Sequence, residues 1–93
     1  MEDIEKKFAE RGIIRGGLLL LRPEDALELI DEAARKRRKV LGVDGFIITN
    51  NSTQPLMDES INLSKYPLEC WEKAKRFLLC RVDRDLFFEI ILD

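Results

Sequence analysis

The stretch that decides the fold runs from Arg22 to Phe46 and reads RPEDALELIDEAARKRRKVLGVDGF. Pro23 suits the first turn of a helix, where its missing N–H costs no hydrogen bond, and the acidic residues after it lie at the positive end of the helix dipole. Gly42 is typical of the residue just past a helix end, so we expect a helix up to Leu41 and a strand from Phe46. Its buried arc is predicted to comprise Leu27, Ile30, Ala34 and Leu41, flanked by Ala26, Ala33 and Val40.

The N-terminal side of this helix is predicted to contain a short helix and one strand. Glu2 to Arg11 has helix-forming residues with Ile4 and Phe8 one turn apart, which indicates an amphipathic segment. The pair Gly16-Gly17 predicts a turn. Leu18 to Leu21 is a continuous apolar run, typical of a strand inside a sheet.

The C-terminal side is predicted to hold a hairpin, a helix and a last strand. Asn50 to Thr53 has the composition of a turn. Gln54 to Asp58 is the expected returning strand, and Pro55 indicates that this strand lies at a sheet edge or contains a bulge. The extended segment could instead lie at Ser60 to Ser64. Tyr66-Pro67 predicts a helix start. This helix is expected to bury Leu68, Trp71, Ala74, Phe77 and Leu78, and a strand is expected over Leu86 to Asp93.

The order of these elements predicts an α+β fold. After the N-terminal segment it is βαββαβ, and right-handed crossovers would give a two-layer, ferredoxin-like arrangement: a four-stranded antiparallel sheet with two helices on one face. Ninety-three residues suffice for one domain, so we expect a single domain over 1–93, with an N-terminal helix and turn at 1–17 and the βαββαβ core at 18–93.

Charge and composition restrict the classes of partner. The chain has 16 basic and 18 acidic residues, a net charge of −2, which disfavours nucleic acid as the main partner. The basic run from Arg35 to Lys39 points around a helix and has no interleaved aromatic residues, so we interpret it as a solvated helix end. We see no signal peptide and no apolar run of membrane-spanning length, so we expect a cytoplasmic protein.

Histidine and cysteine, which are common in catalytic and metal sites, are absent or few in this chain. The chain has no histidine, the commonest general base and zinc ligand. Cys70 and Cys80 are ten residues apart in one predicted helix, about 15 Å, which exceeds the reach of a disulfide. We interpret both as free, buried thiols. We therefore predict no catalytic residue, no metal site and no cofactor, and a protein that is not an enzyme.

Exposed acidic loops are the expected binding surface, because recognition residues concentrate in loops. We predict contacts with a protein partner at Asp44, Asn51, Asp58, Glu59, Asp83 and Asp85.

A family resemblance gives this prediction a more concrete form. The segment RPEDALELID at 22–31, followed by LGVDGF at 41–46 and the closing FEIILD at 88–93, resembles small immunity proteins of bacterial polymorphic toxin systems. The resemblance implies a non-enzymatic inhibitor that binds a cognate toxin in the producing cell and is often acidic when the toxin is a basic nuclease. The basic run at 35–39 departs from a uniformly acidic inhibitor. An alternative is a small-ligand-binding regulatory or self-assembling ferredoxin-like domain, which would form a homodimer through the free face of its sheet.

Overall fold

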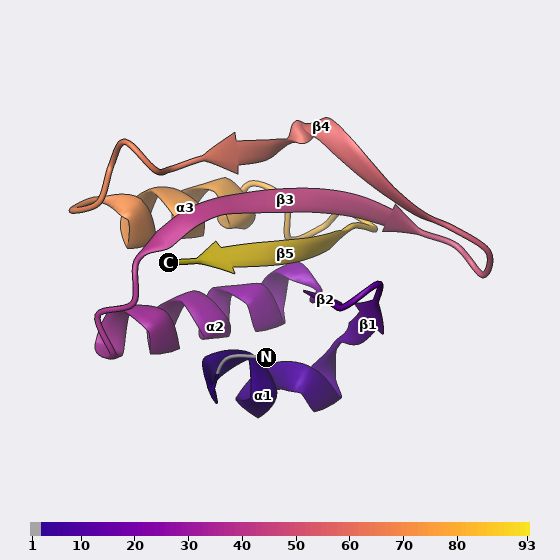
Figure 1. Cartoon of the computed structure of the whole chain (residues 1–93). Helices are drawn as coiled ribbons and strands as arrows, with labels where there is room; N and C mark the ends of the chain where they lie inside the picture. Colours follow the sequence, from indigo (N-terminus) through magenta and orange to yellow (C-terminus); the bar gives the residue numbers. More distant parts are fainter. Residues whose placement is uncertain (1–2) are drawn as a thin grey trace.

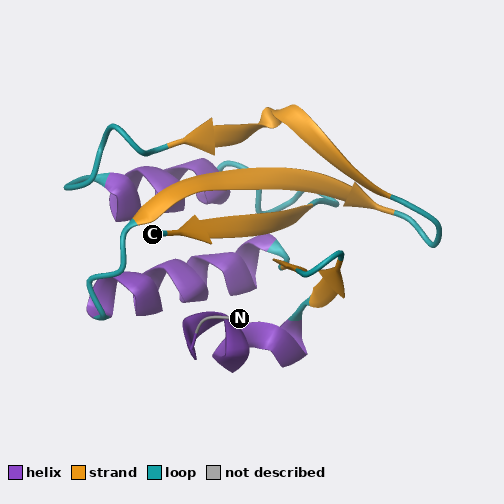
Figure 2. Cartoon of the chain, viewed as in Figure 1, coloured by secondary structure: helices purple, strands orange, loops and turns teal. Residues whose placement is uncertain are grey.

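The computed structural model describes residues 3–93, which form helices and strands in a mixed α+β arrangement (Figures 1 and 2). The helices are α1 (Asp3–Phe8), α2 (Pro23–Arg35) and α3 (Cys70–Leu79), with a 3-10 turn η1 at Ala9–Arg11. The strands are β1 (Ile13–Arg15), β2 (Leu18–Leu20), β3 (Val40–Ile48), β4 (Thr53–Asn62) and β5 (Phe87–Leu92). The expected helix at 2–11 is confirmed from Asp3 onward, while Glu2 lies outside the described residues.

The strands form two antiparallel sheets instead of one. The larger sheet has the order β4-β3-β5, and β1 pairs only with β2 in a separate hairpin. Leu21, just after β2, makes a single bridge to Phe88 of β5, with N···O distances of 2.9 and 2.7 Å. The four-stranded ferredoxin-like order is therefore not confirmed. The physical reason is that the three residues of β2 bond to β1, which leaves one residue to reach the main sheet.

The core lies between one face of the larger sheet and the two longer helices, as expected. In Figure 1, α2 lies along β5, α3 lies behind β3, and α1 packs below α2. One apolar cluster joins these elements, and the ring of Phe77 meets the ring of Phe88 edge to face at 6.2 Å. Its fully buried members include Leu29, Ile30, Ala33, Val43, Leu63, Ala74, Leu78 and Phe88.

Helix α2 begins at Pro23 as predicted but ends at Arg35, earlier than the sequence indicates. Lys36 caps the helix, and Arg37 takes the left-handed conformation with φ of +58°. The N–H of Arg37 bonds to Ala34 O, and the N–H of Arg38 bonds to Ala33 O, the two bonds of a Schellman motif. The prediction that Gly42 ends the helix is wrong, because Val40 pairs with β5 and Gly42 pairs with both β4 and β5. Leu41, predicted to be buried, is exposed.

Helix α3 also begins later than predicted, at Cys70. The turn residues before it include Leu68, which is 81% exposed and was expected in the core. Cys70 is buried, and its sulfur accepts a hydrogen bond from Val40 N at 3.3 Å, whereas Cys80 is exposed. Both cysteines are free, as predicted, and the burial expected of Cys80 is wrong. Among residues 3–93, no helix has the length and apolar content to cross a membrane.

Candidate binding surface

The face of the larger sheet that points away from α2 and α3 is partly open. Because side chains alternate along a strand, Asp44 of β3, Ser60 of β4 and Glu89 of β5 share this face, and the sheet register places them side by side. A groove of about 460 Å³ lies over this region. Its walls come from Leu41, Gly42, Asp44, Met57, Ser60, Ile61, Asn62, Ser64 and Ile91.

Two carboxylates lie next to each other on this face. Asp44 and Glu89 are directly paired in the register of β3 and β5, and within residues 3–93 neither has an ion-pair partner. Partial burial raises the pKa of Glu89, and the nearby charges of Asp44 and Glu5 raise it further. Like charges opposite each other destabilise a sheet, so this pair costs stability unless a cation neutralises it.

A bulge in β4 borders the groove. Asp44 pairs with Ser60, but the next residue of β3, Gly45, pairs with Leu56, so residues 57–59 are left out of the ladder. The hydroxyl of Ser60 donates to Leu56 O at 2.9 Å and accepts from Gly45 N at 3.4 Å, which closes the base of the bulge. Both alternatives for the returning strand, 54–58 and 60–64, therefore belong largely to one bulged strand.

The bulge is fixed from its inner side by Glu59. The Glu59 carboxylate accepts from Arg81 Nε at 2.6 Å and also pairs with Arg84, both in the segment between α3 and β5. Gly45 leaves room for the bulge, since a Cβ there would lie 2.6 Å from Glu59 O. Met57, in the same bulge, is 90% exposed. Bulges commonly redirect a side chain next to a functional site, and this one presents a methionine at the rim of the groove.

The six residues predicted to contact a partner do not form one surface. Asp44 lines the groove and Asp58 is exposed on the bulge beside it. Asn51 lies in the turn at the far end of the β3–β4 hairpin, which projects to the right in Figure 1. The remaining three lie on the bulge or in the segment between α3 and β5. Glu59 forms ion pairs with Arg81 and Arg84, Asp85 pairs with Arg22 at 2.6 Å, and Asp83 is exposed.

Three residues of the surface were missed by the sequence interpretation. Met57, Ser60 and Glu89 were assigned to strands without a role. The only available signal was the break in apolar alternation between the two halves of β4, and it could not identify which residues leave the ladder.

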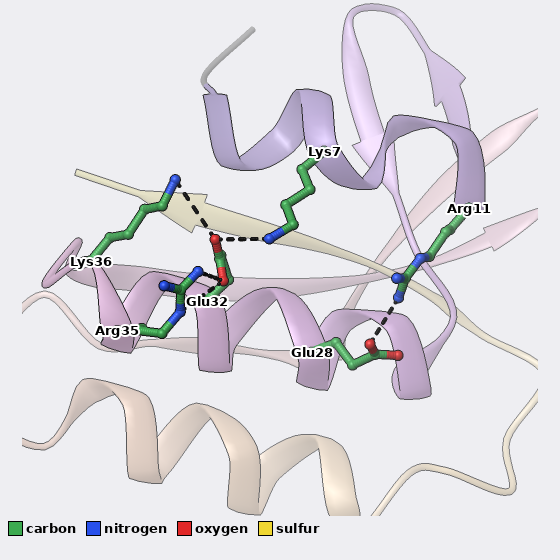
Figure 3. A network of polar contacts seen from close by, with 6 residues as sticks. All are labelled: Lys7, Arg11, Glu28, Glu32, Arg35 and Lys36. Carbon is green, nitrogen blue, oxygen red and sulfur yellow. Dashed lines mark hydrogen bonds and ion pairs between the residues drawn. The ribbon is translucent and has the colours of Figure 1, made fainter.

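A second polar cluster, drawn in Figure 3, fastens α1 to α2. Glu32 is buried on α2, and its carboxylate bonds to Lys7 Nζ at 3.1 Å and to Arg35, with Lys36 at 3.6 Å. The hydrogen bonds from Arg35 and then Lys7 lower the pKa of Glu32 to about 2. Three cations around one carboxylate keep it ionised, so it is unsuited to proton transfer near neutral pH and acts in packing.

The basic run at 35–39 is largely satisfied within the chain. Arg35 and Lys36 pair with Glu32, Arg38 pairs with Asp93, and the ammonium of Lys39 lies 4.5 Å from the centre of the Trp71 ring. These contacts use most of the charge of the run within the chain. Only Arg35 belongs to α2, so the prediction that the five residues point around a helix is wrong.

No group of three or more His, Cys, Asp or Glu side chains within residues 3–93 is placed to hold a metal ion. Neither a protein-family model nor a curated protein matches this chain. The geometry therefore directs attention to the groove, the acid pair and the exposed methionine as a binding surface.

Proposed function

We propose that this chain is a protein-binding domain, and specifically an inhibitor of a cognate toxin in the manner of the immunity proteins that its sequence resembles. The observation that carries the proposal is Met57, a large apolar side chain held almost fully in solvent by an anchored bulge. Transfer of such a side chain into a partner's pocket gains about 2 kcal/mol. Because Glu59, Arg81 and Gly45 fix the bulge, its backbone is already ordered, and the main opposing entropy is that of the methionine side chain, about 0.5 to 1.5 kcal/mol.

The charge of the surface supports a basic partner. Asp44 lines the groove, and Glu89 lies beside Asp44 on the same sheet face; neither has a neutralising cation among the described residues. Asp58 adds a third carboxylate on the bulge. A lysine or arginine of the partner placed over Asp44 and Glu89 would relieve their repulsion, which the free protein cannot do. Complementary charge of this kind mainly accelerates association and selects the partner. A basic toxin is the partner that fits this surface.

The experiment begins with the product of the gene adjacent to this one. The purified chain is titrated into that product, and both binding and loss of its toxic activity are measured. We expect Met57→Lys and Asp44→Lys each to weaken binding at least about tenfold, equivalent to about 1.4 kcal/mol. Ile14→Lys, which alters an equally apolar side chain that is 51% exposed on β1, serves as the matched control and should bind normally. Absence of binding by the wild type, or equal loss in all three variants, contradicts the proposal.

Self-association is the second candidate function, and the open sheet face favours it. A homodimer through this face would bury Leu41 and Met57, both exposed. A two-fold axis near the groove, however, would bring Asp44 and Glu89 close to their own copies. That repulsion predicts a dimer only at acidic pH, where protonation of Glu89, whose pKa is raised mainly by burial, removes one of the charges. Light scattering at pH 7 and pH 4 separates the two functions: a dimer that forms at pH 4 and dissociates at pH 7 supports self-association through this face, whereas a monomer at both pH values supports the inhibitor.

A further inference from the structure

The outer edge of β4 is protected against pairing with another strand along most of its length. In the register of β3 and β4, Pro55 pairs with Phe46, between the hydrogen-bonded pairs on either side, so its missing N–H belongs to the free edge. The bulge at 57–59 then interrupts the strand. Proline and bulges are the devices by which proteins prevent unwanted pairing at a sheet edge. The edge therefore offers no continuous template from 53 to 59.

The same edge is open at Asn62. Leu63 N donates to Leu41 O at 2.8 Å, so the neighbouring pair of Asn62 with Gly42 is a non-hydrogen-bonded pair of the antiparallel ladder. The backbone N–H and C=O of Asn62 consequently point away from β3, and the residue is exposed. One donor and one acceptor are thus available at the point where the protection ends.

A groove runs beside this open position. It has a volume of about 510 Å³ and lies between the end of β4 and α3. Its apolar wall comes from Ile61, Leu63 and Phe77, while Lys73, Arg76 and Cys80 follow one another along the α3 side. These helix residues are three to four positions apart, so they form one stripe facing the strand.

The charge of this groove is opposite to that of the sheet face. The Lys73 ammonium lies 4.5 Å from the centre of the Tyr66 ring and has no carboxylate partner among residues 3–93. Arg76 is paired with Glu72 on the exposed surface of α3. An occupant that brings a carboxylate to Lys73 would complete an ion pair that the chain itself leaves open.

We propose that the end of β4 and the groove beside α3 bind an extended, acidic segment of a partner protein by strand addition at Asn62. One residue of the segment exchanges two hydrogen bonds with the Asn62 backbone. Because alternate side chains of a strand share a face, an apolar residue against Phe77 is followed two positions later by a carboxylate near Lys73. This groove adjoins the groove at Asp44 through Ile61 and Asn62 but differs from it in charge. Lys73 lines only this groove and Asp44 only the other, so Lys73→Glu and Asp44→Lys test the two proposals separately.

The test uses a display library of random 12-residue peptides selected against the full chain. Enriched peptides are expected to carry an apolar residue two positions from Asp or Glu, and to protect the exposed Cys80 thiol from labelling by a maleimide. Cys70 is buried, so labelling of the native protein reports on Cys80. Lys73→Glu should weaken peptide binding at least tenfold. Lys6→Glu, the same charge change on exposed α1, should leave it unchanged.

Backbone pairing is tested with the peptide instead of the protein, so that no variant has to fold. Methylation of the peptide nitrogen that faces Asn62 should abolish the protection of Cys80, and methylation of the next nitrogen should not. Enrichment of basic peptides, no enrichment, or equal binding by the Lys73→Glu variant overturns the proposal. So does concentration-dependent self-association that Lys73→Glu abolishes, because a second copy would then occupy the groove.

Discussion

The ammonium of Lys7 donates a hydrogen bond of 3.1 Å to the buried carboxylate of Glu32, which joins α1 to α2 across 25 residues of sequence. Arg35 shares the same carboxylate. Since these partners lower the pKa of Glu32 to about 2 from its ordinary value of 4.5, the ionised form is stabilised by folding. The contribution is present above pH 4.5 and is lost as the pH falls towards 2.

We therefore expect Glu32→Gln to lower the free energy of unfolding at pH 7 and to have little effect near pH 2. Urea unfolding at both pH values measures the difference. Glu28→Gln removes a carboxylate of α2 that pairs with Arg11 at 3.0 Å but is 58% exposed, and it should change stability little at either pH. A Glu32→Gln effect of the same size at pH 7 and pH 2 would show that lost packing, not charge, is responsible.

The end of α2 yields a stabilising substitution. Arg37 occupies the left-handed position of a Schellman motif, where a side chain costs about 1 to 2 kcal/mol. Part of the gain from glycine is offset by the greater freedom of the unfolded chain, so Arg37→Gly should raise the unfolding free energy by about 1 kcal/mol. Thermal unfolding measures it. Arg37→Ala removes the same charge without relieving the backbone, and an equal gain from alanine would rule out the conformational explanation.

The start of α2 could be predicted from the sequence, and its end could not. Pro23 with Glu24 and Asp25 is a local signal, and the structure confirms it. The end depends on Val40 and Gly42 pairing with strands that lie 20 or more residues away, and those pairs hold even though an arginine occupies the position that favours glycine. Long-range pairing overrides the local signal here.

The binding surface was predicted only in part for the same reason. Asp44 and Asp58 were identified from local composition and are exposed or line the groove. Glu59 has the same local character, yet Arg81 and Arg84, more than 20 residues later, draw it inward. Met57 became an exposed residue through a register shift opposite Gly45, which no local pattern specifies.

Gly45 should tolerate no side chain. A Cβ at this position would lie 2.6 Å from Glu59 O, 2.8 Å from Glu59 Cβ and 3.1 Å from the Phe88 ring, so both the bulge and the core would have to move. We expect Gly45→Ala to destabilise the protein by about 2 to 3 kcal/mol. Gly42→Ala is the comparison: its Cβ would lie 3.0 Å from Ile61 O but 3.7 Å from the next atom, and the loss should be smaller. Chemical denaturation of both variants decides the order.

Glu89 is expected to lower the stability of the free protein and to strengthen the binding of a basic partner. Partial burial, with the charges of Asp44 and Glu5, raises its pKa, so ionisation is penalised by folding and stability decreases as the pH rises above the ordinary value of 4.5. Glu89→Gln should thus stabilise the protein at pH 7 by about 0.5 kcal/mol and have no such effect at pH 3. The same substitution should weaken binding to a basic partner.

Stability and binding, measured together, distinguish a carboxylate that contacts the partner from a surface carboxylate that does not. Thermal unfolding at pH 7 and pH 3 measures the stability change, and titration with the adjacent gene product measures binding. Glu10→Gln, on the exposed surface of η1, is the matched control and should alter neither. If Glu89→Gln raises stability and leaves binding intact, the acid pair lies outside the interface and the partner contacts the bulge alone. If it lowers stability at pH 7, the repulsion between Asp44 and Glu89 is already relieved within the free chain, and a basic partner is no longer required to explain the pair.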